Sequence, residues 1–151
     1  MYKRILVAVD GSSTSKLALA EATRLAKGQQ TNLRLIYVAD EIPEYMADSL
    51  VPGRFEREIR NELRQIGQKI LADCSVKPKQ AQVSFDTKLI MNGNPRRRIG
   101  DVINGEAKRW RANLIVLGTH GRRGLNRLAL GSVAEAVIRL AKRPVLVIHG
   151  Q

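Results

Sequence analysis

Short apolar segments alternate along this chain with longer segments of helical periodicity, and no other feature restricts its fold as strongly. Runs rich in Val, Ile and Leu are predicted to be strands at 4–9, 33–38, 83–89, 114–118 and 144–148. Helical patterns lie between them, over 13–27 and 54–74 and from Asn94 and Ser132 onward. Because strand and helix alternate without interruption, the connections are expected to be right-handed crossovers between parallel strands. We therefore predict a single doubly wound α/β domain over residues 1–151, with a five-stranded parallel sheet and helices on both faces.

The predicted helices carry start, stop and packing signals. Ser12, Ser13 and Thr14 are candidate N-caps of the first helix, and Gly28 is its stop. The third helix is predicted to start at Asn94, with Pro95 as its first helical residue. Apolar positions at helical spacing are predicted to be buried: Phe55, Ile59, Leu63, Ile66, Ile70 and Cys74 in the second helix, Ile99, Val102, Ile103, Ala107 and Trp110 in the third, and Val133, Val137, Leu140 and Ala141 in the fourth.

Two of the predicted strands are uniformly apolar, as strands buried on both faces are. These are the runs "ILVAV" and "LIVL", which we place in the centre of the sheet. The strand at 83–89 alternates apolar and polar residues and is predicted to be an edge. If the first and fourth strands are neighbours, the turns Asp10–Gly11 and Gly118–Thr119 face each other across a crevice. Ligands of such sheets bind in that place.

The charge of the chain is strongly positive and unevenly distributed. The formal net charge is +12, while 44% hydrophobic and 26% charged residues are typical of a folded globular protein. Residues 96–143 contain twelve Lys and Arg against three acidic residues, so they carry +9 of that charge. A basic surface of this kind suits an anionic partner, although a solvated basic face is the more common outcome.

The sequence also bears on the compartment. No apolar stretch approaches the roughly 18 residues of a membrane span, and "MYKRILVAVD" lacks the features of a signal peptide. The single Cys74 cannot form an internal disulfide, and its place on an apolar helix face predicts a packed, inert thiol. We expect a cytoplasmic protein with no membrane contact.

A glycine-rich loop, "GTHGRRGLNRLALGS", follows the fourth strand. It matches neither the P-loop nor the dinucleotide fingerprint. Gly118 and Gly121 would let the backbone approach a bulky ligand, and Gly131, Ser132 and Val133 open a helix whose free N–H groups favour phosphate. Arg122 and Arg123 lie inside the loop, and arginine binds phosphate bidentately, so we expect one of the two, Arg122, to contribute to this site. The alternative is that the glycines serve only tight turns.

Asp10 follows the first strand, and three roles are open to it. Its carboxylate can accept hydrogen bonds from ribose hydroxyls, or hold a divalent metal beside phosphates. It can also simply start an Asp-Gly turn and cap the first helix.

The motif G-x2-G-x9-G-[ST] resembles that of the universal stress proteins. It matches at Gly118, Gly121, Gly131 and Ser132, and "ILVAVDGS", "NGNP" and "RPVLVI" resemble other blocks of that family, so the resemblance covers the whole chain. The resemblance implies a strand order of 3-2-1-4-5 and membership of the nucleotide-binding branch.

The resemblance also implies a site for ATP in which Asp10 contacts the nucleotide. A metal at Asp10 beside the phosphates would be Mg²⁺ or Mn²⁺. The resemblance implies that Val38, beside Ala39, lies against adenine and that the loop glycines, Ser132 and Val133 hold ribose and phosphates. The sequence departs from the family at Arg96, Arg97 and Arg98, which we expect to open the third helix against its dipole.

Catalysis has little support in the sequence. His120 lies in the loop, but no Ser, His and Asp set and no metal-ligand cluster gathers around it. Slow ATP hydrolysis is the most that a metal at Asp10 would supply, so we do not expect a dedicated enzyme.

The apolar strand at 144–148 is an edge in the implied order, and such an edge needs a cover. The same strand of a second copy would cover it, and the family implies this homodimer. Our leading hypothesis is a dimeric, ATP-binding stress or signalling module. The alternative is an anion- or nucleic-acid-binding protein that uses the basic surface of 96–143. Aromatic residues make up only 4% of the chain and no groove-reading motif is present, so we do not expect nucleic acid as the main partner.

Overall fold

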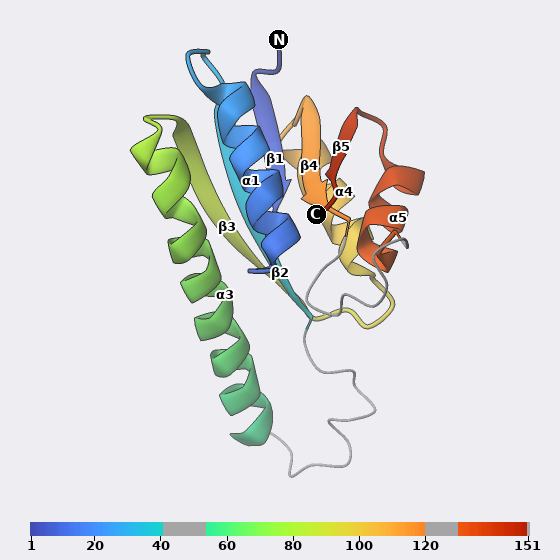
Figure 1. The fold of residues 1–151 in the computed structure, drawn as a ribbon. Coiled ribbons are helices and arrows are strands. Elements are labelled where there is room, and N and C mark those ends of the chain that lie inside the picture. Colours follow the sequence, from blue (N-terminus) through green and yellow to red (C-terminus); the bar gives the residue numbers. More distant parts are fainter. Residues whose placement is uncertain (41–53, 120–129, 151) are drawn as a thin grey trace.

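The computed structural model describes residues 1–40, 54–119 and 130–150 of the chain. The elements in chain order are β1 (Arg4–Ala8), α1 (Ser13–Ala26), β2 (Asn32–Asp40), α3 (Arg54–Gln80), β3 (Ser84–Asn92), α4 (Ile99–Arg109), β4 (Leu114–Gly118), α5 (Ser132–Leu140) and β5 (Val145–Ile148). All neighbouring strands pair in parallel, in the order β3-β2-β1-β4-β5. The predicted fold class and strand order are therefore confirmed (Figure 1).

The sheet separates two hydrophobic cores. On one face α1 packs on β1 and β4, and α3 packs on β2 and β3 (Figure 1). On the other face α4 and α5 pack on each other and on the sheet. Ile5 and Val7 of β1 point into the first core and Leu6 into the second, each at most 1% exposed. The unalternating apolar runs thus occupy the centre of the sheet, as predicted.

Helix α1 lies close to the sheet because its buried face is made of small residues. Ala18, Ala22 and Ala26 are at most 1% exposed. A Cβ added to Gly118 of β4 would lie 2.8 Å from Thr14, so only glycine permits this approach. The hydroxyl of Ser12 accepts a hydrogen bond from the Ser15 N–H and caps the helix, which confirms one of the three candidate N-caps.

Helix α3 is longer than its apolar pattern predicts, since it continues past Cys74 to Gln80. The additional residues are mostly polar and carry no hydrophobic periodicity, although Lys and Gln are good helix formers. The helix is followed by Gln82, whose positive φ of 55° reverses the chain toward β3. Cys74 itself is buried, and burial raises the pKa of its thiol, in agreement with an inert residue.

Two positions that periodicity assigns to the core are exposed. Ile66 is 41% and Leu140 is 43% exposed. Beside Ile66, Gly67 occupies the buried face of α3, where a Cβ would clash with Tyr37 and Leu89. The backbone of α3 therefore packs directly on the sheet there. Trp110 is half-buried, and the Arg34 guanidinium lies 4.7 Å from its ring centre.

Helix α4 starts at Ile99 and not at Asn94 and Pro95, so the predicted boundary was wrong. The Asn94 carbonyl accepts a hydrogen bond from the Arg97 N–H at 2.9 Å, and its side chain accepts one from the Arg96 N–H at 3.0 Å. These two hydrogen bonds close a turn. Asn-Pro is typical of turns as well as of helix starts, and here it forms a turn. Arg96 and Arg97 consequently precede the helix, and Arg98 is its N-cap.

Helices α4 and α5 pack closely where Gly100 meets Ala136, and substitution of the glycine tests this contact. A Cβ on Gly100 would lie 2.6 Å from the Cβ of Ala136, whereas one on Gly105 would meet only the flexible end of Arg97. We expect Gly100→Ala to lower the free energy of unfolding by about 1–3 kcal/mol through overpacking. In the same helix, Gly105→Ala is expected to raise it by up to about 1 kcal/mol through helix propensity. Urea denaturation measures both, and equal stabilisation by the two would contradict the close contact.

Candidate functional site

The carboxyl ends of β1 and β4 lie side by side, because the two strands pair from Ile5 with Leu114 to Val7 with Val116. The turn at Asp10 and Gly11 follows β1, and Gly118 and Thr119 end β4. Both turns therefore leave the same edge of the sheet, at the lower end of the strands in Figure 1. In a sheet of this order, the chain connects to opposite faces on the two sides of this point, and ligands of such sheets bind there.

Asp10 shapes the turn between β1 and α1. Its Oδ1 accepts a hydrogen bond from the Ser12 N–H at 2.9 Å, and Gly11 between them has a φ of +82°. Such a φ favours glycine. Of the three roles open to Asp10, the turn-forming role is therefore realised, through its Oδ1. Roles toward ribose or metal stay predictions.

The start of α5 presents backbone donors at the same edge. Gly131 is the N-cap, and it has no side chain with which to satisfy the first helical N–H groups. The N–H groups of Ser132, Val133 and Ala134 begin the helix, where no intrahelical acceptor exists. Ser132 is exposed and Val133 is half-buried. This end of the helix also carries the positive end of its dipole, which favours an anion.

Hydrogen bonds tie this helix start to β4 and β5. The Gly131 N–H donates to the Thr119 carbonyl at 2.7 Å, and the Thr119 N–H donates to the Ile148 carbonyl at 2.9 Å. The position of the α5 donors is thus linked to the end of the edge strand β5.

Val38 and Ala39, at the end of β2, point to opposite faces of the sheet. Val38 packs partly buried on the α4 side, whereas Ala39 is 2% exposed within the α1 and α3 core. Of the two side chains, that of Val38 is the more accessible at the edge.

Gly118 has a packing role that sequence reasoning did not assign. Because Thr14 takes the space where its Cβ would lie, glycine is required there for the contact between β4 and α1. Any ligand role of Gly118 therefore comes in addition to this one. Gly121 and Arg122 of the predicted site lie outside the described residues, as does His120.

Sequence reasoning missed a polar pair at the ends of β2 and β3. Asp40 and Asn92 are register partners, and the Asn92 amide donates to Asp40 Oδ1 at 2.8 Å and to the Arg97 carbonyl at 2.6 Å. Asn92 is 8% exposed. It pins the turn before α4 against the end of β2. Polar residues that end two neighbouring strands are the signal that would have revealed this pair.

A buried charge cluster lies away from this edge, on the α4 face of the sheet. Glu106 is 1% exposed and accepts hydrogen bonds from Arg34 at 3.0 Å, Lys88 at 2.9 Å and Arg109. Burial alone raises the pKa of Glu106, but the three cations outweigh burial and lower that pKa. A carboxylate so fully paired serves structure and is no candidate acid or base.

Two further findings concern the described part of the chain. Within 1–40, 54–119 and 130–150, no three His, Cys, Asp or Glu side chains lie close enough to bind a metal ion together. No helix of these segments has the length and apolar character needed to cross a bilayer.

The sequence model of the universal stress protein family matches residues 1–149. The chain belongs to the universal stress protein family. Universal stress protein YxiE of Bacillus subtilis is 37% identical over 153 aligned residues, which cover 99% of this chain and all of YxiE.

The family fold also appears in solved structures. Protein MJ0577, a universal stress protein of Methanocaldococcus jannaschii, superposes with a TM-score of 0.83 at 26% identity over all of this chain and 98% of its own. A universal stress protein from Archaeoglobus fulgidus in complex with dAMP gives a TM-score of 0.71 at 22% identity over 97% of this chain and 98% of its own. At that identity the second likeness concerns the fold alone.

Proposed function

We propose that this universal stress protein belongs to the nucleotide-binding branch of its family and binds ATP at the carboxyl edge of its sheet. The observation that carries the proposal is the start of α5, whose backbone donors lack a side-chain cap and lie at the edge where β1 and β4 end. A triphosphate is an anion that such donors suit. The complex of a family member with dAMP supports adenine as the base.

The proposed site combines backbone and side-chain contacts. Ser132 and Val133 bind phosphates through their N–H groups, and Gly131, whose own N–H is bonded to Thr119, leaves room for the phosphate because it has no side chain. Val38 packs against adenine with the backbone of Ala39 beside it. Asp10 accepts hydrogen bonds from ribose through its carboxylate. The glycines Gly118 and Gly121 and the side chain of Arg122 complete the site.

A metal ion fits this site only as a companion of the phosphates. Asp10 offers one carboxylate, one oxygen of which already accepts the Ser12 N–H. Mg²⁺ commonly takes one or two carboxylates and completes its shell with phosphate oxygens and water. Asp10 with bound ATP would therefore hold Mg²⁺ or Mn²⁺. The metal would neutralise phosphate charge, and we expect slow ATP hydrolysis at most.

The proposed output is a change in the dimer. Phosphate binding acts on the N–H groups that follow Gly131, and Gly131 is linked through Thr119 to the end of β5. Strand β5 is the open edge through which we propose the homodimer to form. Nucleotide occupancy would thus alter the dimer or its surface, consistent with a signalling module. We place this module in the cytoplasm, where its single, buried Cys74 stays reduced.

Removing the backbone N–H of Ser132, the first residue of α5, tests the proposed phosphate contact. Proline is tolerated at the first helical position, and Gly131 already has the extended backbone that precedes proline, with φ −63° and ψ 150°. Ser132→Pro deletes the N–H and the hydroxyl while keeping the helix, whereas Ser132→Ala deletes only the hydroxyl. We expect Ser132→Pro to weaken ATP binding about 10- to 100-fold, as for loss of a charge-assisted hydrogen bond. Adenosine binding should change little. Calorimetric titration measures both ligands, and parent-like ATP affinity in Ser132→Pro would refute the contact.

Replacing Asp10 with asparagine separates its turn-forming role from its ligand role. In Asp10→Asn the amide oxygen of the new side chain would still accept the Ser12 N–H, so the turn is preserved while the negative charge is lost. We expect Asp10→Asn to weaken MgATP binding by roughly 10-fold or more with an unchanged melting temperature. Asp73→Asn, an exposed change on α3, is the matched control. Equal affinity of Asp10→Asn and the control would leave Asp10 with a purely structural role.

Proline in the edge strand tests the dimer. The carbonyls of Pro144 and Ile148 accept hydrogen bonds from β4, so by alternation the N–H of Val147 faces the open edge. Val147→Pro removes that donor and is compatible only with an unpaired edge. In sedimentation we expect a dimer for the parent and for Val147→Ala, and a folded monomer for Val147→Pro. A monomeric parent at micromolar concentration would contradict the proposed dimer.

A further inference from the structure

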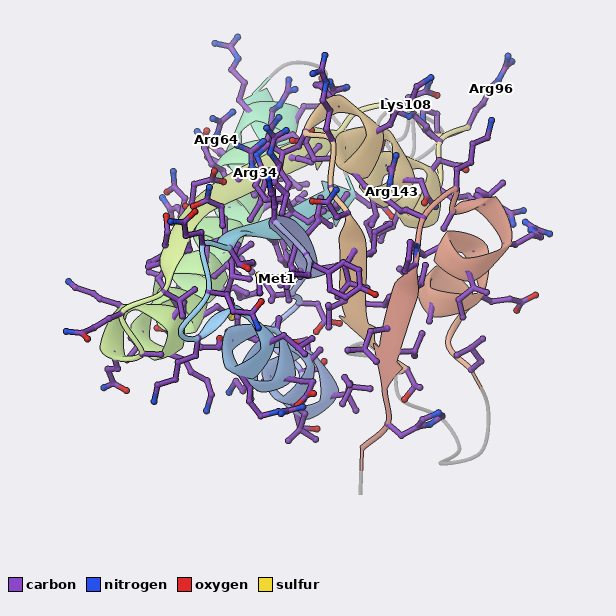
Figure 2. All side chains as sticks on the ribbon, turned by 90° about the horizontal axis from the view of Figure 1, so that it is seen from above. Met1, Arg34, Arg64, Arg96, Lys108 and Arg143 are labelled. Atoms are coloured by element: carbon purple, nitrogen blue, oxygen red, sulfur yellow. The ribbon has the colours of Figure 1, made fainter. Side chains whose placement is uncertain are left out.

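Basic side chains gather along α4, on the face of the sheet opposite α1. Arg96 and Arg97 precede the helix, Lys108 and Arg109 form its last turn, and Arg111 follows it, and all five are exposed. We call these five residues the α4 surface. In Figure 2, Arg96 and Lys108 project outward from the α4 side, and Arg34 lies on the same side of the sheet.

Three acidic groups near α4, Glu106, Asp86 and Asp101, are engaged in internal contacts. Glu106 is buried beneath the helix among Arg34, Lys88 and Arg109. Asp86 binds Arg34 at 2.6 and 2.9 Å, and the Asp101 carboxylate accepts the Arg98 N–H at 3.0 Å at the start of the helix. The carboxylates thus stabilise the fold, while Arg109 keeps 65% of its side chain exposed. The outward charge of the α4 surface is therefore positive.

The distance between these positive charges suits an extended anion better than a small one. Helix α4 has 11 residues, which span about 16 Å, and basic residues flank it at both ends. A single small anion reaches only one end, whereas a polyanion reaches both. Four of the five residues are arginine, whose planar guanidinium matches phosphate with two parallel hydrogen bonds.

The scarcity of exposed aromatics favours a double helix over a single strand. Among the described side chains, Tyr2 is the only exposed aromatic one, and Trp110 is covered by Arg34. Single strands are held largely by base stacking on aromatic residues, whereas a duplex offers closely spaced phosphates on its outside. We propose that the α4 surface binds the phosphate backbone of double-helical nucleic acid, without reading its base sequence.

Three of the five residues of the α4 surface lie away from the proposed ATP site. Lys108, Arg109 and Arg111 lie just before β4, at the amino edge of the sheet, whereas the α5 donors lie at its carboxyl edge, as do Arg96 and Arg97, which follow β3. Variants at the amino edge therefore test this proposal separately from the ATP site, and failure of one proposal leaves the other standing.

The test is fluorescence anisotropy with the full chain and a labelled DNA duplex of about two helical turns, in salt from about 50 to 200 mM. The variant Arg96→Glu/Lys108→Glu changes one residue at each end of α4. The matched control Lys69→Glu/Lys77→Glu makes the same charge change on exposed positions of α3. We expect the α4 variant to lose at least about 10-fold in affinity and its salt slope to fall by about two, while the control stays near the parent.

Several results would overturn the proposal. These are no binding of the duplex by the parent at the lowest salt, equal losses in variant and control, tighter binding of a single strand, or equal competition by polyglutamate of matched charge. The last result would point to an acidic protein as the partner. Lys108→Glu/Arg111→Glu changes only the amino edge of the α4 surface and should also weaken duplex binding. Calorimetric ATP titration of that variant should match the parent, which keeps this test independent of the nucleotide site.

Discussion

Burial of β1 and β4 on both faces is the constraint on which the rest of this structure depends. Two central strands without polar positions need a helix layer on each side. On one side this layer can approach because α1 presents alanines and β4 ends in Gly118, against which Thr14 packs. On the other side, Gly100 and Ala136 bring α4 and α5 together in the same way. Small residues therefore set the spacing of both layers, and the strand ends between them form the candidate site.

The same architecture couples the candidate site to the edge of the sheet. The peptide groups of Gly131 and Thr119 are part of the route from the start of α5 to the end of β5. Both hydrogen bonds are backbone contacts, so they depend on the fold more than on particular side chains. In the function proposed above, this link joins nucleotide occupancy to the homodimer.

Charge is segregated between the interior and the surface of this protein. The buried carboxylate of Glu106 is surrounded by three cations, and this pairing holds α4 to β2 and β3. Removing one partner of such a group is costly, because the remaining charges lose their compensation. The exposed cations beyond this cluster face solvent along α4. Because Glu106, Asp86 and Asp101 are used in internal contacts, they do not neutralise the exposed cations, and the α4 surface is basic.

The sequence by itself determined the fold class, the central strands, the edge position of the third strand and the start of α5 at Ser132. These follow from periodicity and from local capping signals, which act over a few residues. The tertiary structure decided the start of α4, where an Asn-Pro turn and the Asp101 cap competed, and the exposure of Ile66, where Gly67 meets the sheet instead. It also decided the pairing of Asp40 with Asn92 and of Glu106 with its cations. Such contacts join residues far apart in the chain, and no local pattern records which distant group will fill the space beside a side chain.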